Sequence, residues 1–172
     1  MVRMKNTNQS ILMNPNDTFS IFQPTGEKLN HIAQWLMNKD VPNVEDYERD
    51  YTYIWYNIIP KMINRPDLHY YYEMRDFGGI FGFIHIIPEH KCTLPLKIWN
   101  PKAWNSTFLR DGKELIKLIM EEHSLRRINA QSADERMVKF AEKFGFKVDG
   151  IKKNDFKFNG EYIDSYLLSM EE

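Results

Sequence analysis

The C-terminal segment, residues 137–169, contains the pattern that most constrains the fold. Apolar residues recur there at spacings of three and four up to Phe144, and Gly145 follows directly. This predicts an amphipathic helix that ends at a left-handed glycine. Two extended apolar segments then flank the pair Asn159-Gly160, which is typical of a tight turn between antiparallel strands. The chain is therefore expected to end in a helix followed by a β-hairpin.

Capping boxes mark two helix starts in the second half of the chain. Asp111 stands three residues before Glu114, and Ser132 stands three residues before Glu135. In such a pair the first side chain caps the free amide groups of the helix, and the second closes back onto the cap. Two earlier helices are expected at residues 24–41 and 43–63, where apolar residues recur at helical spacing. Pro60 is expected to end or kink the second of these.

Extended segments rich in β-branched and aromatic residues predict the strands. Besides the terminal hairpin, they lie at residues 19–22, 68–75, 79–87, 93–100 and 127–131. The second and third of these segments are expected to pair as a hairpin. Pro95 would interrupt a fully paired strand, so we place it at a bulge or a strand start. The predicted order is strand, two helices, three strands, helix, strand, helix and two strands.

Length and charge limit the number of domains and the kinds of partner. The chain has 172 residues, of which 42% are hydrophobic, enough to bury one core. We expect one domain at residues 18–172, preceded by a polar arm at residues 1–17. The 23 basic and 24 acidic side chains are mixed along the chain and leave a net charge of −1. Such a balance gives no field that attracts nucleic acid or an anionic membrane.

The single cysteine, Cys92, excludes an internal disulfide and has no companions at metal-ligand spacing. A metal site is therefore not expected. No leader pattern opens the chain, and no run reaches the roughly 18 apolar residues of a membrane helix. Together these features favour a protein of the reducing cytoplasm, with no membrane partner.

The tail resembles the end of N-acetyltransferases of the GNAT superfamily and is most similar to the branch of ribosomal-protein N-terminal acetyltransferases. The positions that carry the resemblance are Gly145, Phe146, Asp149, Gly150, Gly160 and Asp164. Asp149 stands for the usual Glu of that branch. The likeness covers the C-terminal third in detail, and the predicted element order matches the family elsewhere. It implies an α+β fold with a mixed, twisted sheet, splayed at its middle and flanked by about four helices.

The resemblance also implies a site for acetyl-CoA. In the family, the pantetheine arm lies between two splayed strands, which here are residues 93–100 and 127–131. Ile98, Trp99 and Asn100 would then contact the cofactor, and a backbone amide at Trp99 or Asn100 would polarise the thioester carbonyl. The diphosphate would bind the loop before the next helix, where the family has a Gln/Arg-x-x-Gly-x-Gly/Ala pattern.

That phosphate-loop pattern is altered in this sequence. Placed before a helix that starts at Asp111, it falls on residues 107–112, with Thr at the first position and Arg at the middle glycine. The candidate contacts of the diphosphate are then Leu109, Arg110, Asp111, Gly112 and Lys113. Asp111 would occupy amide groups that the phosphates need and would repel them, whereas Arg110 and Lys113 would offset the repulsion. Asp111→Asn is therefore expected to tighten cofactor binding.

A similarly altered loop, with a proline shortly after the strand as at Pro101, resembles that of some phage-encoded members of the family. The resemblance thus allows a phage or prophage origin.

No carboxylate in residues 93–100 marks a general base. His85, on the preceding strand, is the candidate because an imidazole titrates near neutrality. The alternative interpretation of His85 is a half-buried strand residue bonded to a backbone carbonyl. Glu73 and His90 are weaker candidates. Many family members use a tyrosine as the acid that protonates the thiolate, and that position here is Ala141.

Four further residues have both a functional and a structural interpretation. Asp134 falls where relatives often have an asparagine that contacts the cofactor arm, but it can also stabilise the start of its helix. Tyr51 and Trp55 would border the acceptor cleft, although aromatic residues at helical spacing more often pack in a core. Tyr166 would face either the cleft or the core, which alternation along the strand leaves open.

Two classes of function remain open from the sequence. The first is acetyl transfer from acetyl-CoA to a primary amine, either a protein N-terminus or a small polyamine-like molecule, by a monomer or homodimer. The second is a protein that keeps the fold, has lost acetyl transfer and acts by binding a partner protein or as a structural subunit of a phage assembly. The altered loop and the missing strand carboxylate favour the second class, whereas the tail pattern bears only on the fold.

Overall fold

A computed structural model of the chain describes residues 16–41, 44–64 and 69–171. Within them the strands form one mixed sheet, in the order β1-β2-β3-β4-β6-β8-β7, with β5 paired to β3 alone. The strands are β1 (Phe19–Ile21), β2 (Tyr70–Met74), β3 (Gly79–Ile87), β4 (Lys91–Thr93), β5 (Leu96–Ile98), β6 (Arg127–Ser132), β7 (Lys147–Phe158) and β8 (Glu161–Glu171). The α+β fold that the resemblance implied is confirmed. Most of the predicted polar arm, residues 1–15, lies outside the described residues.

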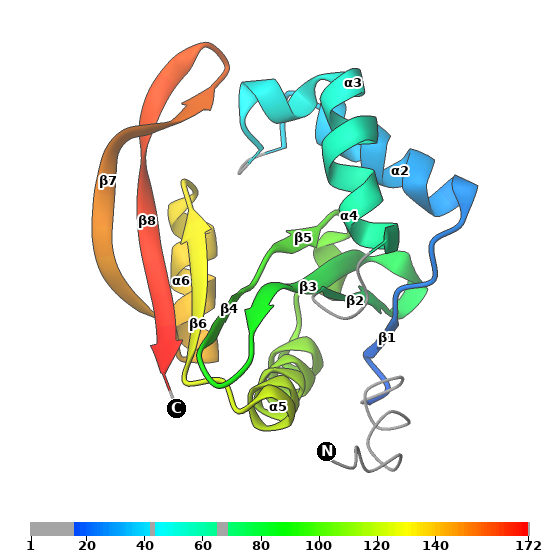
Figure 1. Ribbon diagram of the computed structural model, residues 1–172. Helices are drawn as coiled ribbons and strands as arrows, with labels where there is room; N and C mark the ends of the chain where they lie inside the picture. The colour runs from blue at the N-terminus through cyan, green and yellow to red at the C-terminus, as the bar shows by residue number, and fades with distance from the viewer. Residues whose placement is uncertain (1–15, 42–43, 65–68, 172) are drawn as a thin grey trace.

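Helices cover both faces of this sheet (Figure 1). The α-helices are α2 (Gly26–Met37), α3 (Tyr51–Tyr53), α4 (Ile59–Asn64), α5 (Ser106–His123) and α6 (Glu135–Phe144). The short turns are η1 (Asp46–Arg49), η2 (Ile54–Ile58), η3 (Arg75–Phe77) and η4 (Pro101–Ala103). Ile80 packs in a core with α2 and η2, whereas its neighbour Phe81 packs in a second core with α5 and α6. Successive residues of a strand point to opposite faces, so β3 divides the two cores. Among the described helices, none is both long and apolar enough to cross a membrane.

The helix predicted at residues 43–63 is divided into several pieces, which corrects the single helix expected there. Asp50 has extended backbone angles and caps the turn after it by accepting the amide of Tyr53 at 2.8 Å. A capping aspartate needs non-helical angles, so it separates η1 from α3. Pro60 does not end the helix. A π-type bond from the Ile59 amide to the Ile54 carbonyl precedes it, which changes the helical bonding just before a residue that has no amide hydrogen.

The tail has the predicted form. Gly145 ends α6 at a φ of 109°, and its amide and that of Phe146 satisfy carbonyls of the last turn. Asn159 and Gly160 both have positive φ and join β7 to β8. Strands β2 and β3 also pair antiparallel as expected, through the turn η3.

The predicted strand at residues 93–100 is split around Pro95, and this split opens the sheet. Before the proline, β4 pairs with β3 on one side and runs parallel to β6 on the other. After it, β5 keeps the pairing with β3 and is not paired with β6. Because a proline has no amide hydrogen, it favours such an interruption of the ladder. The sheet is therefore splayed between β5 and β6.

Candidate active site

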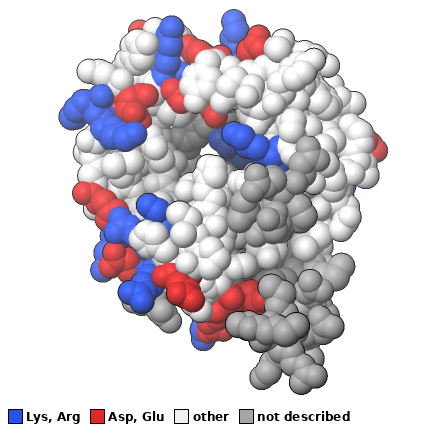
Figure 2. All heavy atoms as spheres, in the orientation of Figure 1, with Lys and Arg blue, Asp and Glu red and all other residues white. Residues whose placement is uncertain are grey.

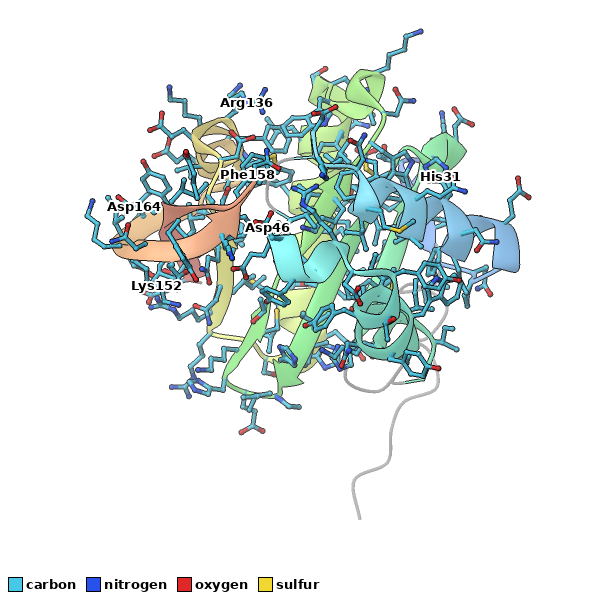
Figure 3. All side chains as sticks on the ribbon, turned by 90° about the horizontal axis from the view of Figure 1, so that it is seen from above. His31, Asp46, Arg136, Lys152, Phe158 and Asp164 are labelled. Atoms are coloured by element: carbon cyan, nitrogen blue, oxygen red, sulfur yellow. The ribbon has the colours of Figure 1, made fainter. Side chains whose placement is uncertain are left out.

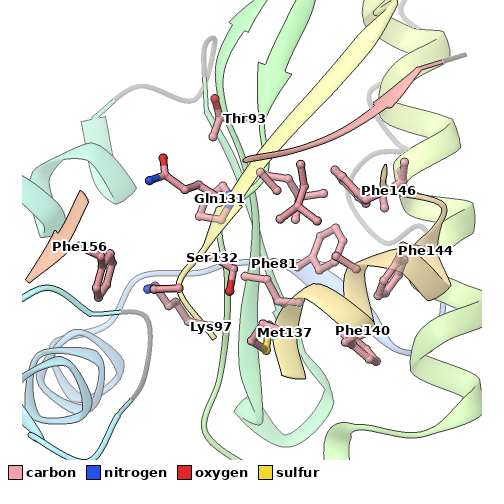
Figure 4. Close-up of a pocket in the computed structure, with 18 of the residues that line it drawn as sticks. Phe81, Thr93, Lys97, Gln131, Ser132, Met137, Phe140, Phe144, Phe146 and Phe156 are labelled. Carbon is pink, nitrogen blue, oxygen red and sulfur yellow. The ribbon is translucent and has the colours of Figure 1, made fainter. Parts of the chain in front are cut away.

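A cavity of about 290 Å³ lies at the splay between β5 and β6 (Figure 4). Its walls come from both strands, from α6 and from η1, with further residues of β3, α5 and the terminal hairpin. The gap that the resemblance implied is therefore present, and side chains do not fill it.

Along residues 95–99, successive backbone amide and carbonyl groups point alternately toward β3 and toward the gap. Gly82 donates its amide to the Pro95 carbonyl at 2.8 Å, and Trp99 donates to Gly78 at 3.1 Å. Odd-numbered residues of this run therefore bond to β3, and the amides of Leu96 and Ile98 point toward the gap. This corrects the expectation for Trp99 and Asn100 as oxyanion donors. The amides of both residues donate to the Gly78 carbonyl, at 3.1 and 3.0 Å.

The cavity is apolar at the end that lies between β6 and α6. Met137, Phe140 and Phe144 of α6 line it there, opposite Phe81 of β3. Phe144 also contacts α5, because a Cβ added at Gly112 would lie only 2.6 Å from its ring. Gly112 thus allows α5 and α6 to pack closely behind the cavity wall. It lies inside α5 and not at the N-terminus of that helix, where the sequence predicted it.

The other end of the cavity is charged. Lys97 extends from β5 toward Phe156 of β7 in Figure 4, and Glu45 and Glu48 line the cavity from the side of η1. Residue Lys97 pairs with Ile80 across β3, so its side chain lies on the face of the sheet that carries α2 and η2. Sequence reasoning missed these three charged residues. A lysine inside an otherwise apolar strand was the signal that could have found Lys97.

The terminal hairpin closes over this charged end. Asp46 accepts the amides of Asn159 and Gly160, each at 2.8 Å, and Glu45 accepts the amide of Lys157 at 3.3 Å. The guanidinium of Arg49 lies 5.2 Å from the ring centroid of Phe158. We call this contact between η1 and residues 157–160 the hairpin clasp. Figure 3 shows Asp46 and Phe158 near each other at this contact.

Helix α5 starts six residues before the predicted position, because its cap is Asn105 and not Asp111, which corrects the predicted phosphate loop. Asn105 is its cap and accepts the amide of Phe108 at 2.9 Å. The segment at the helix's positive end is therefore residues 99–105, with Lys102 exposed in it. Placed relative to this boundary, the family pattern falls on residues 101–106 instead of 107–112.

Asp111 is not a cap, because it lies in the second turn of α5 with only 2% of its surface exposed. Its carboxylate accepts hydrogen bonds from the Thr18 hydroxyl and from Arg110, the latter at 2.7 Å. Burial alone would raise the pKa of Asp111, but these two hydrogen bonds, together with the positive charges of Arg110 and Arg75, outweigh burial and hold its pKa below the usual value. Asp111 thus ties α5 to the start of β1, and the repulsion of a diphosphate predicted for it loses its structural basis.

The structure does not bring the three candidate bases to the cavity. His85 is exposed at a bulge of β3, with a φ of 52°, and its ring contacts that of His69 at 5.5 Å. Glu73 pairs with Lys28 on the face of α2, and His90 is exposed in the turn before β4. The alternative of a half-buried His85 is not seen either.

The remaining predicted residues lie around the site without lining it. Asp134 caps α6 through the Arg136 amide, and the Arg136 side chain lowers the pKa of its carboxyl group. Tyr51 is 61% exposed and contacts Trp55, whose ring packs against the core of α2 and η2. Tyr166 donates its hydroxyl to Glu135 at 3.2 Å.

Charge on the visible surface is mixed. In Figure 2 the Lys and Arg side chains lie among Asp and Glu side chains. Ion pairs such as Lys153–Asp164, at 2.6 Å on the terminal hairpin, account for part of this mixture.

In a comparison with protein-family models, the model of the acetyltransferase (GNAT) domain matches residues 21–167. A comparison with curated proteins gave no match. Among solved structures, spermidine N-acetyltransferase from Vibrio cholerae in complex with CoA and spermine is 16% identical, with a TM-score of 0.66 over 91% of this chain and 96% of that chain.

Two further structures have the same fold. Ribosomal-protein-S5-alanine acetyltransferase from Vibrio fischeri is 17% identical, with a TM-score of 0.65 over 91% of this chain and 94% of that one. A microcin C7 self-immunity acetyltransferase in complex with acetyl-CoA and AMP is 13% identical, with a TM-score of 0.67 over 94% and 99% of the two chains. At these identities, the likeness concerns the fold.

Proposed function

Because the chain belongs to the GNAT acetyltransferase family, we propose that it transfers an acetyl group from acetyl-CoA to a primary amine. The observation that carries this proposal is the open gap between β5 and β6, whose walls join an apolar end to a charged end. Solved relatives of the fold include complexes with CoA and with acetyl-CoA, which supports acetyl-CoA as the acetyl donor.

The residues around the gap fit a thioester with a pantetheine arm and a diphosphate. The amides of Leu96 and Ile98 point into the gap and can donate to the arm as an added strand would. The diphosphate would bind at the N-terminus of α5, where the first amides of the helix lack intrahelical partners and the helix dipole is positive. Lys102 adds a positive side chain at that end. Acetyl-CoA supplies the activated acyl group when bound.

The acceptor amine would enter from the charged end of the cavity. Glu45 and Glu48 give this end a negative potential, which attracts an ammonium group. One solved relative is in complex with spermine, and another acts on the alanine of ribosomal protein S5 by its name. Both a polyamine and a protein N-terminus therefore remain candidate acceptors for this chain.

A catalytically inactive protein of the same fold is the second candidate. The observation that favours it is the segment at the N-terminus of α5, residues 99–105, which contains no glycine. Glycines in such a loop let backbone amides close on phosphates. Weak or absent binding of acetyl-CoA would favour this candidate over the transferase.

The test combines calorimetry with acetyl-CoA and a thiol-release assay with spermidine or an alanine-starting peptide as the acceptor. We expect binding, thermal stabilisation of about 2.7 kcal/mol at a cofactor concentration 100 times its dissociation constant, and acceptor-dependent release of CoA. The variant Ile98→Pro removes one amide that faces the gap while leaving the β3 pairing intact, so it should weaken binding. Ile98→Val keeps the amide and is the matched control. If millimolar acetyl-CoA produced no binding heat and no thermal stabilisation, the proposal of a transferase would be refuted.

A further inference from the structure

The proposed reaction needs a group that takes a proton from the acceptor, because an amine is protonated at neutral pH and only its neutral form attacks a thioester. Among the described residues that line the cavity, the ionisable side chains are Glu45, Glu48 and Lys97. None of the bases expected from the sequence lines it. The proton acceptor is therefore sought among these three.

The two carboxylates already hold the backbone in place. Glu48 accepts the amide of Glu45 at 3.1 Å, and Glu45 accepts the amide of Lys157 at 3.3 Å. These bonds fix η1 and the hairpin clasp. Glu45 and Glu48 can thus attract a cationic acceptor, while their protonation would weaken the closure of the cavity.

Lys97 differs from them in position and surroundings. It stands between Leu96 and Ile98, whose amides face the gap, and its side chain extends to the charged end in Figure 4. We propose that Lys97, in its neutral form, is the catalytic residue that accepts the proton of the acceptor ammonium. The inference rests on the proposed function, and it names the catalytic residue of the same site.

The electrostatics around Lys97 support this role. Burial lowers the pKa of its ammonium group, the attraction of Glu48 opposes that shift, and the positive charge of Arg49 adds to it. Both charged neighbours come from η1, and Arg49 is held there by the carbonyls of Val41 and Val44, at 2.8 and 2.9 Å. The side chains of Gln131 and Ser132 on β6 and of Phe156 on β7 are uncharged. A lowered pKa increases the fraction of a lysine that is neutral at a given pH, which is the form that can accept a proton.

The proton and group transfers balance without a further reactant. Neutral Lys97 takes one proton from the acceptor ammonium, and the resulting amine forms a bond to the acetyl carbonyl carbon. The carbon–sulfur bond then breaks, and the thiolate takes the second proton that the nitrogen loses. The products are the acetylated amine, free CoA thiol and a Lys97 ammonium, which returns its proton to solvent.

The first test is kinetic. Lys97→Arg keeps a positive charge but cannot lose its proton near neutral pH, so we expect kcat/KM with spermidine to fall by about 100-fold or more. Acetyl-CoA binding and the melting temperature should remain close to those of the wild type. Lys91→Arg, on β4 outside the cavity, is the matched control and should keep its activity. A Lys97→Arg enzyme with near wild-type activity would overturn the role of Lys97, whereas an inactive wild type would overturn the proposed function instead.

The second test does not depend on activity. In protein labelled with ¹³C-lysine, the Cε resonance of Lys97, assigned by its loss in Lys97→Arg, should titrate at lower pH than those of the other lysines. Glu48→Gln removes an attraction and should move that titration to still lower pH. Titration of Lys97 together with the exposed lysines would contradict the proposal, and so would abolition of turnover by Glu48→Gln while Lys97→Arg remains active.

Discussion

At the scale of single residues, the sequence around Asp111 is compatible with two structural roles, a helix cap and a buried acceptor of hydrogen bonds. The sequence Asp111-Gly-Lys-Glu114 has the spacing of a capping box, and a cap at that place would have faced a bound diphosphate. The structure instead caps α5 at Asn105 and buries Asp111 against Thr18 and Arg110. Local spacing cannot distinguish the two, because the partner Thr18 lies 93 residues away in the chain.

A prediction for Asp111 follows from this burial. Asp111→Asn should lower the free energy of unfolding by about 1–3 kcal/mol, because a buried acceptor of two hydrogen bonds is replaced by a poorer one. The folded-state pKa is lowered, so the stabilisation is present above the ordinary Asp pKa of about 3.9 and is lost as pH falls through the lower folded value. Urea unfolding at pH 7 and near pH 3 measures both effects. The difference between wild type and variant should shrink at the lower pH, and acetyl-CoA affinity should not change.

At the scale of elements, the hairpin clasp joins parts of the chain more than a hundred residues apart. The turn residues Asn159 and Gly160 were predicted from their pair alone, since this pair adopts positive φ with little strain. The sequence does not predict the docking of that turn on η1, because its spacing indicates one long helix over residues 43–63. In one continuous helix, the Asp46 carboxylate would not be positioned to accept the amides of Asn159 and Gly160, as it does in the structure.

We expect Asp46→Ala to open the clasp while leaving the sheet intact. The pKa of Asp46 is lowered chiefly by the amide of Gly160, so its bonds are present at neutral pH and weaken as pH falls through that lowered value. Hydrogen exchange should become faster at the amides of Asn159 and Gly160 in the variant. Asp164→Ala is the matched control, since Asp164 accepts the amide of Asn154 in the same hairpin and should affect that amide alone. Unchanged protection at the turn in Asp46→Ala would show that the clasp does not hold it.

At the scale of the whole molecule, the sheet keeps an open gap in its middle that a continuous ladder would close. Unfilled space in a core lowers stability, since the lining atoms lose contacts. The halves on either side of the gap are connected by the pairing of β4 with β6 and by the hairpin clasp. An open gap of this kind is expected where a ligand takes the place of a strand.

A larger side chain in the gap should therefore raise the stability of the fold and at the same time prevent the binding of acetyl-CoA. Ala130 of β6 lines the cavity and is partly buried, so Ala130→Leu should raise the free energy of unfolding by about 0.5–2 kcal/mol while abolishing the binding of acetyl-CoA. Denaturant unfolding and calorimetry measure the two quantities. Val148→Leu, at an exposed position of β7, should change neither. Full acetyl-CoA affinity in Ala130→Leu would place the cofactor outside this gap.

The sequence by itself determined the elements whose signals are local. These are the end of α6 at Gly145, the Asn159-Gly160 turn, the amphipathic face of α2 and the interruption at Pro95, and each depends on backbone angles or spacings of a few residues. The predicted placement in the cytoplasm, the phage origin and the choice of acceptor remain predictions.

Only the tertiary structure decided which side chains meet at the cavity. The cavity brings together Lys97 with Glu45 and Glu48, which lie about 50 residues earlier in the chain. His85 points away from the cavity because a β-bulge changes the side-chain alternation of β3 at that point. The start of α5 was also decided by packing, since a buried Asp111 and a close contact between Gly112 and Phe144 require those residues inside the helix. Contacts between distant segments have no local pattern, and for that reason the sequence predicted the fold better than the site.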